Sequence, residues 1–368
     1  MSTRPRIYLD WSASAPLAEA ARAAMTDAMA ELANPSSVHA EGRRARDRVE
    51  TARRHVADLV GRPREQLIFT SGGTEANQLG VRALAAAAER RGLPHVVATT
   101  PLEHPSLKGA IAALGWKIVM LPTDEPVGVV AAALVNHELG TILDAPLPAG
   151  ALVHLDVVQA AGKLDLRQVV ADSLAVSAHK IGGPQGAGAL VLSTDEGLSL
   201  DTEQAGHQER GRRPGTENLV GIVGFGAAAA AVDPTVGTVV AGVSQLAAWA
   251  DVAALGDRLE RGILAIPATR IHGADLPRVG GIVNAGFSGA RGQDLVIALD
   301  LAGIAASTGA ACTSGSVKPS EVLLGLGMAP EQALEAVRFS LGPTTSEAQI
   351  DEVLRTLAIV VERARLHR

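Results

Sequence analysis

The sequence contains a single cysteine, Cys312, among its 368 residues. One thiol cannot form a disulfide within the chain, so a reducing cytoplasm is the expected compartment. Unpaired cysteines are usually buried as small apolar residues. Cys312 instead lies in residues 307–316, STGAACTSGS, where Gly309 and Gly315 stand among small side chains. We therefore expect Cys312 to lie on a loop, where burial in a core does not account for its presence.

Long apolar runs and blocks of like charge are also missing. No apolar run is long enough to span a bilayer, and residues 1–16 lack the apolar segment of a secretory signal. The formal net charge of −6 is spread along the chain, which argues against nucleic-acid binding. The arginine-rich segment 41–54 alternates basic and acidic residues, and we expect a helix with one solvated face. We expect no metal site.

Strand-like and helix-like segments alternate through the first two thirds of the chain. Apolar strands joined by short crossovers predict an α/β fold with a mainly parallel sheet covered on both faces. Within residues 122–153, the segments PTDEPVGVV and TILDAPLPAG are too short to form full helical crossovers, so one face of the sheet is expected to be more open there. The expected strands are residues 65–72, 95–100, 117–121, 129–135, 151–158, 174–181 and 186–193, and the expected helices are residues 74–92 and 106–115.

A different pattern begins near Thr216. Two long helices are expected at residues 216–232 and 238–265, followed by a strand, a helix, the cysteine loop, a strand and a last helix. Thr344 and Glu347 have the spacing of a capping box at the start of that last helix. We place the domain boundary near residue 245, which gives a large domain of residues 15–245 and a small domain of residues 1–14 and 246–368.

Residues 70–77, TSGGTEAN, carry a strand into a helix through two glycines. Free backbone N–H groups and the positive end of the helix dipole at such a turn can hold a phosphate, and Thr74 would add a hydroxyl group. Glycine turns between a strand and a helix are also common without a ligand. This segment alone leaves both interpretations open.

Two polar residues follow apolar strands. Asp156 lies near the end of its strand, where ligands of open α/β sheets bind, and Gln159 could face the same pocket. A carboxylate here needs a cation or solvent, although a structural role is more common. His104 could stack on a ring or transfer protons, but a single histidine is more often an ordinary surface residue.

The segment 175–192 delivers Ser177, His179 and Lys180 into a glycine-rich turn. A lysine at the end of a buried strand must be paired, neutralised or used covalently. A desolvated lysine amine is the nucleophile that forms a Schiff base, whereas a lysine that extends to water is the alternative. The same sequence supports either interpretation.

Together these segments describe one ligand. Its phosphate would lie at Thr74, its aromatic cation would pair with Asp156, and its aldehyde would react with Lys180. Pyridoxal phosphate has these three features, and a lysine with an acidic partner for the ring nitrogen is its usual protein environment. The sequence therefore predicts a pyridoxal-phosphate enzyme.

The sequence resembles the cysteine desulfurases, class V members of the fold-type I pyridoxal-phosphate enzymes, over nearly its whole length. The resemblance implies a large domain with a mainly parallel seven-stranded sheet, a smaller α+β C-terminal domain, and a homodimer with shared active sites. It rests on ten ordered segments: IYLDWSASAP, NPSSVHAEGR, TSGGTEAN, LEHPSL, VNHELG, HLDVVQAAGK, SAHKIGGPQGAGAL, QERGRRPGTEN, STGAACTSGSVKPSEVL and VRFSLG.

The resemblance also implies a role for individual residues. Lys180 would bind the cofactor aldehyde and remove the substrate α-proton, and His104 would stack on the ring. Arg338 would hold the substrate carboxylate, although a structural salt bridge is the alternative. The implied cofactor site comprises Gly73, Thr74, His104, His137, Asp156, Gln159, Ser177, His179, Lys180 and, from the neighbouring subunit, Thr216; the implied substrate site comprises Asn34, His137 and Arg338.

Cys312 acquires a role from the same resemblance. In the family this residue takes the sulfur of bound L-cysteine as a persulfide, releases L-alanine and passes the sulfur to an acceptor protein. Small residues and glycines give such a carrier freedom to move, and residues 307–319 resemble the long-loop group. An incidental thiol is the alternative.

The chain departs from the family at two positions. His137 stands where the family has a second asparagine, and His207 replaces a usual glycine. The C-terminal helix, which includes residues 361–368, is also expected to be short. In the family the C-terminal tail often helps to dock the scaffold protein for iron–sulfur clusters, so the sulfur acceptor of this chain stays open. Selenocysteine lysis, another class V reaction or a non-catalytic scaffold of a sulfur pathway are therefore the alternative functions.

Overall fold

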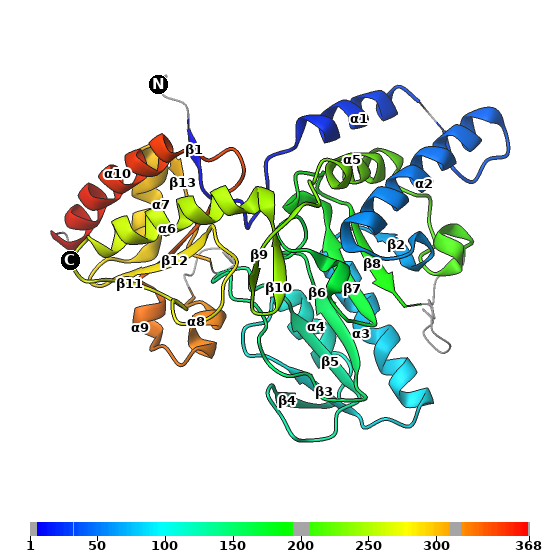
Figure 1. Ribbon diagram of the computed structural model, residues 1–368, viewed down its shortest axis with the longest axis horizontal. Helices are drawn as coiled ribbons and strands as arrows, with labels where there is room; N and C mark the ends of the chain where they lie inside the picture. The colour runs from blue at the N-terminus through cyan, green and yellow to red at the C-terminus, as the bar shows by residue number, and fades with distance from the viewer. Residues whose placement is uncertain (1–5, 32, 194–205, 310–317, 367–368) are drawn as a thin grey trace. The chain divides into compact units, whose positions relative to one another are not determined.

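The computed structural model describes residues 6–31, 33–193, 206–309 and 318–366, and divides into two compact units (Figure 1). The large unit comprises Ala15–Leu134 and Leu143–Pro234, and the small unit comprises Met1–Ser14, Val135–Ile142 and Thr235–Arg368. The division falls at Pro234 rather than near residue 245, and residues 135–142 belong to the small unit.

The large unit contains a seven-stranded sheet in the order β2-β8-β7-β6-β5-β3-β4. The strands from β7 through β4 are mutually parallel, and β8 is antiparallel to both of its neighbours. The predicted α/β class and mainly parallel sheet are confirmed. The strands are β2 (Leu67–Thr70), β3 (Val96–Thr99), β4 (Lys117–Met120), β5 (Val129–Ala133), β6 (Leu152–Asp156), β7 (Ser173–Ser177) and β8 (Gly188–Leu192).

Helices cover both faces of this sheet, as the apolar strands predict. Ile68 and Phe69 are adjacent on β2 and so point to opposite faces. Ile68 belongs to the core beneath α3 and α4, and Phe69 packs edge-to-face against Phe225 of α5. The helices are α1 (Glu19–Met29), α2 (Ala40–Val60), α3 (Gly73–Arg90), α4 (Pro105–Ala112) and α5 (Leu219–Ala230). Residues 122–153 contain β5 and no helix, as expected.

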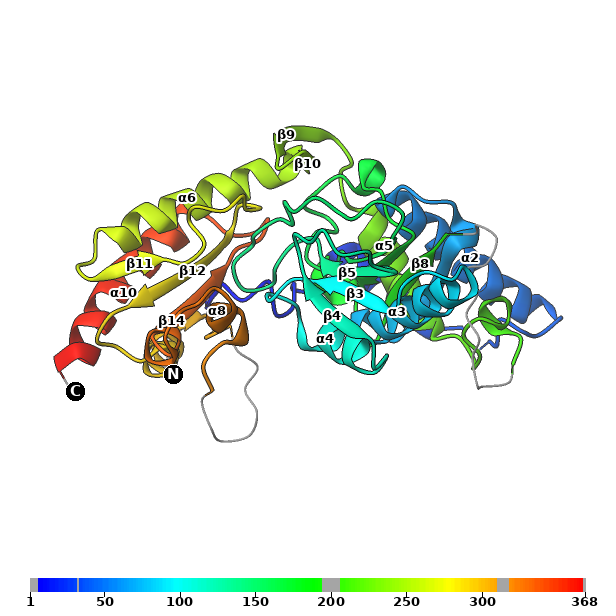
Figure 2. The same cartoon turned by 90° about the horizontal axis from the view of Figure 1, so that it is seen from below.

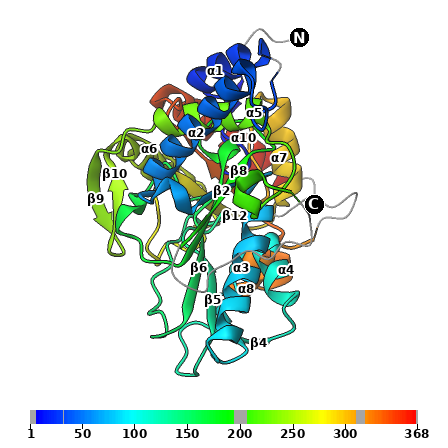
Figure 3. The same cartoon turned by 90° about the vertical axis from the view of Figure 1, so that its right-hand side faces the viewer.

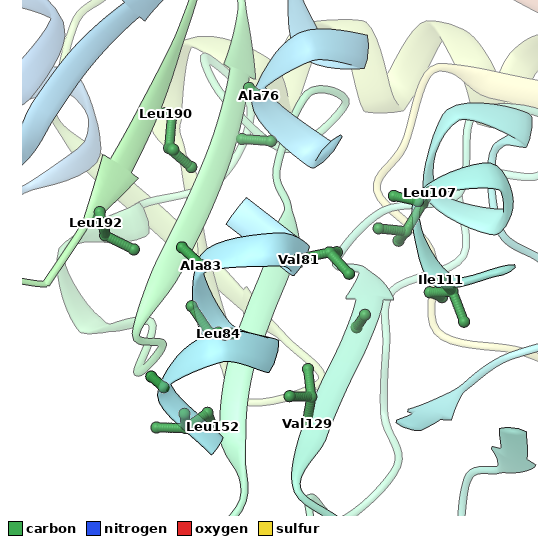
Figure 4. Close-up of a cluster of buried hydrophobic side chains, with 14 of the residues drawn as sticks. Ala76, Val81, Ala83, Leu84, Leu107, Ile111, Val129, Leu152, Leu190 and Leu192 are labelled. Carbon is green, nitrogen blue, oxygen red and sulfur yellow. The ribbon is translucent and has the colours of Figure 1, made fainter. Parts of the chain in front are cut away.

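A hydrophobic core cluster lies between α3, α4 and the sheet (Figure 4). Alanines and valines on α3, among them Ala76 and Val81, face leucines and valines of the strands, and Leu107 and Ile111 join them from α4. Small side chains let α3 approach the sheet closely, and Figure 3 shows α3 and α4 side by side along it. This packing fixes the start of α3 at one edge of the sheet.

One arginine of α2 contradicts the expectation of a solvated charged face. Arg53 is buried, donates two hydrogen bonds to Glu209 at 2.7 and 2.8 Å, and lies 4.8 Å from the centre of the Phe69 ring. Glu209 also accepts a hydrogen bond from the Phe69 N–H at 3.0 Å. The backbone of Glu209 itself has a φ of 48°. Because Glu209 is distant in sequence, local charge alternation could not reveal this pair.

The small unit contains a three-stranded antiparallel sheet, β11-β12-β14 (Figure 2). Helices α6 and α7 contact this sheet, and α10 packs against these two helices. A second pair, β1 and β13, is parallel. The elements are β1 (Ile7–Tyr8), β11 (Thr269–Ile271), β12 (Ile282–Phe287), β13 (Ile304–Ala305), β14 (Ala336–Ser340), α6 (Ala250–Leu264), α7 (Gly292–Leu301), α8 (Glu321–Gly325), α9 (Pro330–Ala333) and α10 (Glu347–Leu366).

The helix expected over residues 238–265 is wrong in its first half. A hairpin of β9 (Val236–Val240) and β10 (Val243–Leu246) precedes α6. Its two turn residues, Ala241 and Gly242, have φ of 48° and 74°, the backbone that a tight two-residue hairpin requires. Valines favour strands, so the valine-rich stretch around this turn pairs with itself instead of extending the helix.

The start of α10 also differs from the prediction. The Gln349 N–H donates to Ser346 Oγ at 3.3 Å, and the Ser346 N–H donates to Gln349 Oε1 at 3.0 Å. This reciprocal pair is a capping box, two residues after the one proposed at Thr344 and Glu347. Short 3-10 turns complete the chain: η1 (Arg64–Gln66), η2 (Leu166–Gln168), η3 (Ala178–Lys180), η4 (Gln208–Gly211) and η5 (Ala247–Trp249).

Among the described residues, none of the helices is both long and apolar enough to cross a membrane.

Gly80, inside α3, provides a test of the close packing. A Cβ atom there would lie 2.5 Å from the ring of His154 and 2.7 Å from Ser173 Oγ, so we expect Gly80→Ala to destabilise the protein by about 1–3 kcal/mol. Gly109 in α4 has no atom within 4 Å of the same position. Gly109→Ala is the matched control and should stabilise the protein by about 0.5–1 kcal/mol. Urea denaturation measures both, and equal effects would contradict the packing.

Candidate functional site

The four predicted segments of the large unit meet at the carboxyl edge of its sheet. Asp156 ends β6, Ser177 ends the parallel neighbour β7, and Lys180 ends the turn η3 that follows. The α3 segment begins at the same edge, because β2 is antiparallel to β8 and therefore parallel to β7. Asp156, His104 and Lys180 are close enough for their charges to influence one another. The structure thus brings these three together.

Asp156 is buried, with 6% of its surface exposed. Burial raises the pKa of its carboxyl group above the ordinary value, and hydrogen bonds from Asn77 Nδ2 at 2.8 Å and the Val158 N–H at 2.9 Å, with His104 and Lys180, offset part of this rise. Each of these groups favours the carboxylate form. A bound cation in contact with Asp156 would add to the same effect.

His104 is the N-cap of α4, and its Nδ1 accepts a hydrogen bond from the Ser106 N–H at 3.1 Å. Because a backbone N–H can only donate, the proton of the neutral ring is on Nε2. Burial lowers the pKa of His104, Asp156 raises it, and Lys180 lowers it further. With its pKa below the ordinary value, the imidazole is neutral at neutral pH and has an Nε2–H to donate.

The start of α3 forms a cradle for an anion. Gly72 is the N-cap and provides no side-chain cap, and a Cβ on Gly73 would lie 2.7 Å from Val158 Cγ2. Ser177 and His179 face each other, with 2.9 Å between Oγ and Nδ1. Burial and the charge of Lys180 lower the pKa of His179 to about 4. Thr74, in the first turn of α3, is exposed.

Gln159 is buried beside a lysine that sequence reasoning missed. Lys163 Nζ donates to the Gln159 carbonyl oxygen at 2.8 Å and lies 3.4 Å from Gln159 Oε1. Burial, aided by Lys180, lowers the pKa of Lys163 to about 7. The spacing of four residues after Gln159 was the available signal, because it returns the chain to the same side of a helical turn.

Glu103, adjacent to His104, was also missed. Its carboxylate accepts hydrogen bonds from Thr100 Oγ1 at 2.5 Å and from the Ala133 N–H at 2.8 Å. Burial and the charge of Asp156 raise the pKa of Glu103, and the two hydrogen bonds lower it; the result is a pKa of about 7. Glu103 therefore ties the loop that carries His104 to the end of β5.

In the small unit, Arg338 of β14 is 4% exposed and forms two contacts. Nη1 donates to the His137 carbonyl oxygen at 3.0 Å, and Nη2 donates to Asp10 Oδ1 at 2.7 Å. Among the described residues, Nε of Arg338 is buried without a hydrogen-bond partner. The predicted pair of Arg338 and His137 is therefore in contact through the backbone, and Asp10 is an additional partner that sequence reasoning missed.

The remaining predicted residues are not joined to these groups by any hydrogen bond in the described parts of the chain. Asn34 is exposed and its Oδ1 accepts the Ser36 N–H at 2.9 Å. Thr216 is exposed in the segment before α5. Cys312 lies outside the described residues.

Glu103 gives a prediction on pH and stability. Its pKa of about 7 in the folded protein lies above the ordinary 4.5, so the folded state binds more protons between these values. Stability is therefore lost as the pH rises from 4.5 to 7, by up to about 3 kcal/mol. In Glu103→Gln this part of the loss should disappear. Urea denaturation at pH 5, 6 and 7 measures it, and an unchanged slope would contradict the buried carboxyl.

Comparison with known proteins assigns the chain to a family. The family Aminotransferase class-V matches residues 7–353. The chain is 37% identical to a cysteine desulfurase from Cereibacter sphaeroides, covering 98% of this chain and 97% of that protein. It is 36% identical to an IscS-like cysteine desulfurase from Mycobacterium tuberculosis, covering 97% of each.

Solved structures agree with these relatives. A NifS-like protein has a TM-score of 0.82 and 26% identity, covering 97% of this chain and 100% of its own. DndA from Streptomyces lividans has a TM-score of 0.70 and 29% identity, covering 88% of this chain and 96% of its own. The chain therefore belongs to the class-V aminotransferase family, and the curated relatives it matches over nearly its whole length are cysteine desulfurases.

Proposed function

We propose that this protein is a pyridoxal-phosphate-dependent cysteine desulfurase. In this function L-cysteine is converted to L-alanine, and its sulfur passes to Cys312 as a persulfide and then to an acceptor protein. The observation that carries the proposal is the buried Asp156 beside His104 and Lys180 at the carboxyl edge of the sheet. The cysteine desulfurases to which the chain is similar support the substrate.

The residues of the large unit fit pyridoxal phosphate. The uncapped first turn of α3 offers N–H groups to a phosphate, and at Gly73 a Cβ atom would fill the space next to Val158. Ser177 and His179 would add hydrogen bonds, and Asp156 would pair with the ring nitrogen. Bound there, the cofactor supplies an aldehyde for Lys180 and a ring that accepts electrons from the substrate carbon.

The protein's own groups then handle the protons. Asp156 would keep a proton on the ring nitrogen, because the N–H donors of Asn77 and Val158 favour its carboxylate form. Lys180 is the base for the substrate α-proton, at Nζ. His104 presents Nε2–H, a donor for the substrate side of the ring, since its Nδ1 is held by the Ser106 N–H.

Cys312 performs the sulfur step. Its thiolate is the nucleophile and forms an S–S bond to the substrate sulfur as the substrate C–S bond breaks. The electron pair of that bond stays with the carbon skeleton, which gains a proton and leaves as alanine. The persulfide sulfur is then available to an acceptor protein. A scaffold protein for iron–sulfur clusters is one candidate acceptor.

Arg338 would bind the substrate carboxylate. Its Nε has no partner among the described residues, and its guanidinium is held in place by Asp10 and the His137 carbonyl oxygen. Exposed Thr216 suits the family's contribution from a neighbouring subunit, so a homodimer with shared sites is part of the proposal. His137, at the position of a family asparagine, is the residue that would alter the preference between cysteine and selenocysteine.

The decisive experiment follows absorbance and products together. The purified protein should show the near-ultraviolet or visible absorbance of a lysine-bound cofactor and should release alanine from L-cysteine. Lys180→Ala should lose that absorbance. Cys312→Ser should keep it but lose persulfide formation by at least about a hundredfold, because the attacking thiolate is gone. Persulfide formation by Cys312→Ser would contradict the role of this residue.

Arg338 provides a separate prediction on substrate binding. Arg338→Lys keeps a charge near Asp10 but removes the fork of donors that a carboxylate binds. We expect KM for L-cysteine to rise by about 10- to 100-fold, the effect of losing a charged hydrogen bond, with the cofactor absorbance unchanged. Steady-state kinetics measure KM, and an unchanged KM would assign Arg338 to a structural salt bridge.

A further inference from the structure

A buried polar chain lies beneath Asp156. His154 precedes Asp156 by two residues on β6 and so points to the same face of the sheet. His154 is 0% and Asn77 is 1% exposed. His154 Nε2 lies 3.0 Å from Asn77 Oδ1, and His154 Nδ1 lies 2.9 Å from Ser173 Oγ. Asn77 in turn contacts Asp156 at 2.8 Å and Ser106 Oγ at 3.0 Å through Nδ2.

The donors and acceptors of this chain have a direction. Asn77 Nδ2 has two hydrogens, and it gives one to Asp156 and one to Ser106. Asn77 Oδ1 can only accept, so His154 must donate from Nε2. His154 Nδ1 then accepts from the Ser173 hydroxyl. Burial lowers the pKa of His154 to about 3, so the ring stays neutral and has a single proton to place.

The orientation of Asn77 decides the state of its two neighbours. With the amide rotated by half a turn, Oδ1 would face an ionised Asp156 at hydrogen-bond distance, and two acceptors repel each other. That rotated amide favours a protonated Asp156, which has no negative charge to pair with a protonated ring nitrogen. Rotation would also offer Ser106 an acceptor, and so compete with His104 Nδ1, which lies 2.7 Å from Ser106 Oγ.

We propose that His154 is a positioning residue for the reaction: as the neutral Nε2–H form it locks the Asn77 amide with its NH2 toward Asp156 and Ser106. In this way the buried His154 imidazole favours the carboxylate form of Asp156, which pairs with the nitrogen of the cofactor ring. It also leaves the Ser106 hydroxyl group available to donate to His104 Nδ1. This inference rests on the proposed function, because Asp156 and His104 act there on the bound cofactor.

Space for this ring is made by α3. At Gly80, in the interior of that helix, a Cβ atom would lie 2.5 Å from both Cε1 and Nδ1 of His154. Glycine inside a helix is less favourable than alanine. Gly80 lies where α3 crosses the His154 ring and Ser173, and any larger residue there would overlap with them. The absence of a side chain at Gly80 therefore provides the space that the His154 ring occupies.

Two variants separate positioning from packing. His154→Gln has an amide that can still donate to Asn77 and accept from Ser173, whereas His154→Leu has a similar volume and neither function. We expect His154→Leu to weaken binding of pyridoxal phosphate by about tenfold, the ratio that matches one hydrogen bond to a charged group. The pH at which the absorbance of the bound cofactor changes should shift as well. His154→Gln should restore most of both properties.

Equal behaviour of the two variants would overturn the proposal, because simple packing does not distinguish a donor from a methyl group. If His154→Leu does not fold, Ser173→Ala replaces it. This variant removes only the donor to His154 Nδ1, and the same two measurements should then move in the same direction by a smaller amount. No change in Ser173→Ala would also count against the proposal.

The form of the ring is read independently of activity. Nitrogen NMR of protein labelled with 15N-histidine should show His154 as the neutral Nε2–H form from pH 5 to 8, with cofactor bound. The Nδ1–H form or a charged ring in that range would overturn the proposal. A wild-type protein that binds no pyridoxal phosphate would refute the proposed function instead, and the NMR of the cofactor-free protein would still test the chain from Ser173 to Asn77.

Discussion

The candidate site depends on one buried carboxylate. Asp156 is placed at the end of a parallel strand, where water is largely excluded and an anion is unfavourable without compensation. The surroundings supply that compensation piece by piece, with N–H donors from Asn77 and Val158 and positive charge from Lys180. Under the proposed function this carboxylate would pair with the cationic ring of the cofactor, and the surrounding groups provide that negative charge before any ligand binds.

Much of the fold followed from local sequence. Strands of the large unit and the glycine turn before α3 were predicted because their signals are short-range: apolar runs, alternation of elements and two adjacent glycines. The hairpin at Ala241 and Gly242 was missed although its valines favour strands, because its turn lacks the Asn-Gly or Asp-Gly pair that usually marks a two-residue hairpin. The capping box at Ser346 was displaced by two residues because several polar residues there have compatible spacing.

The site was predicted in part for the same reason. Asp156 and Ser177 end strands, and His104 and Lys180 lie in the segments that follow strands, so apolar runs in the sequence locate all four. Their buried supports could not be found in that way, because Asn77 reaches Asp156 only when α3 has packed on the sheet. Asp10 reaches Arg338 across most of the chain length. Such contacts exist in the folded protein and leave no local periodicity.

The buried pair of Arg53 and Glu209 has a consequence for how this protein can change over evolution. Removing either partner alone would strand a charge in the interior, at a cost of about 3–5 kcal/mol, whereas an apolar pair of matching volume would be tolerated. Substitutions at the two positions are therefore expected to be inherited together among descendants. Glu209 also binds the backbone of Phe69, so any such lineage must find a new acceptor for that N–H as well.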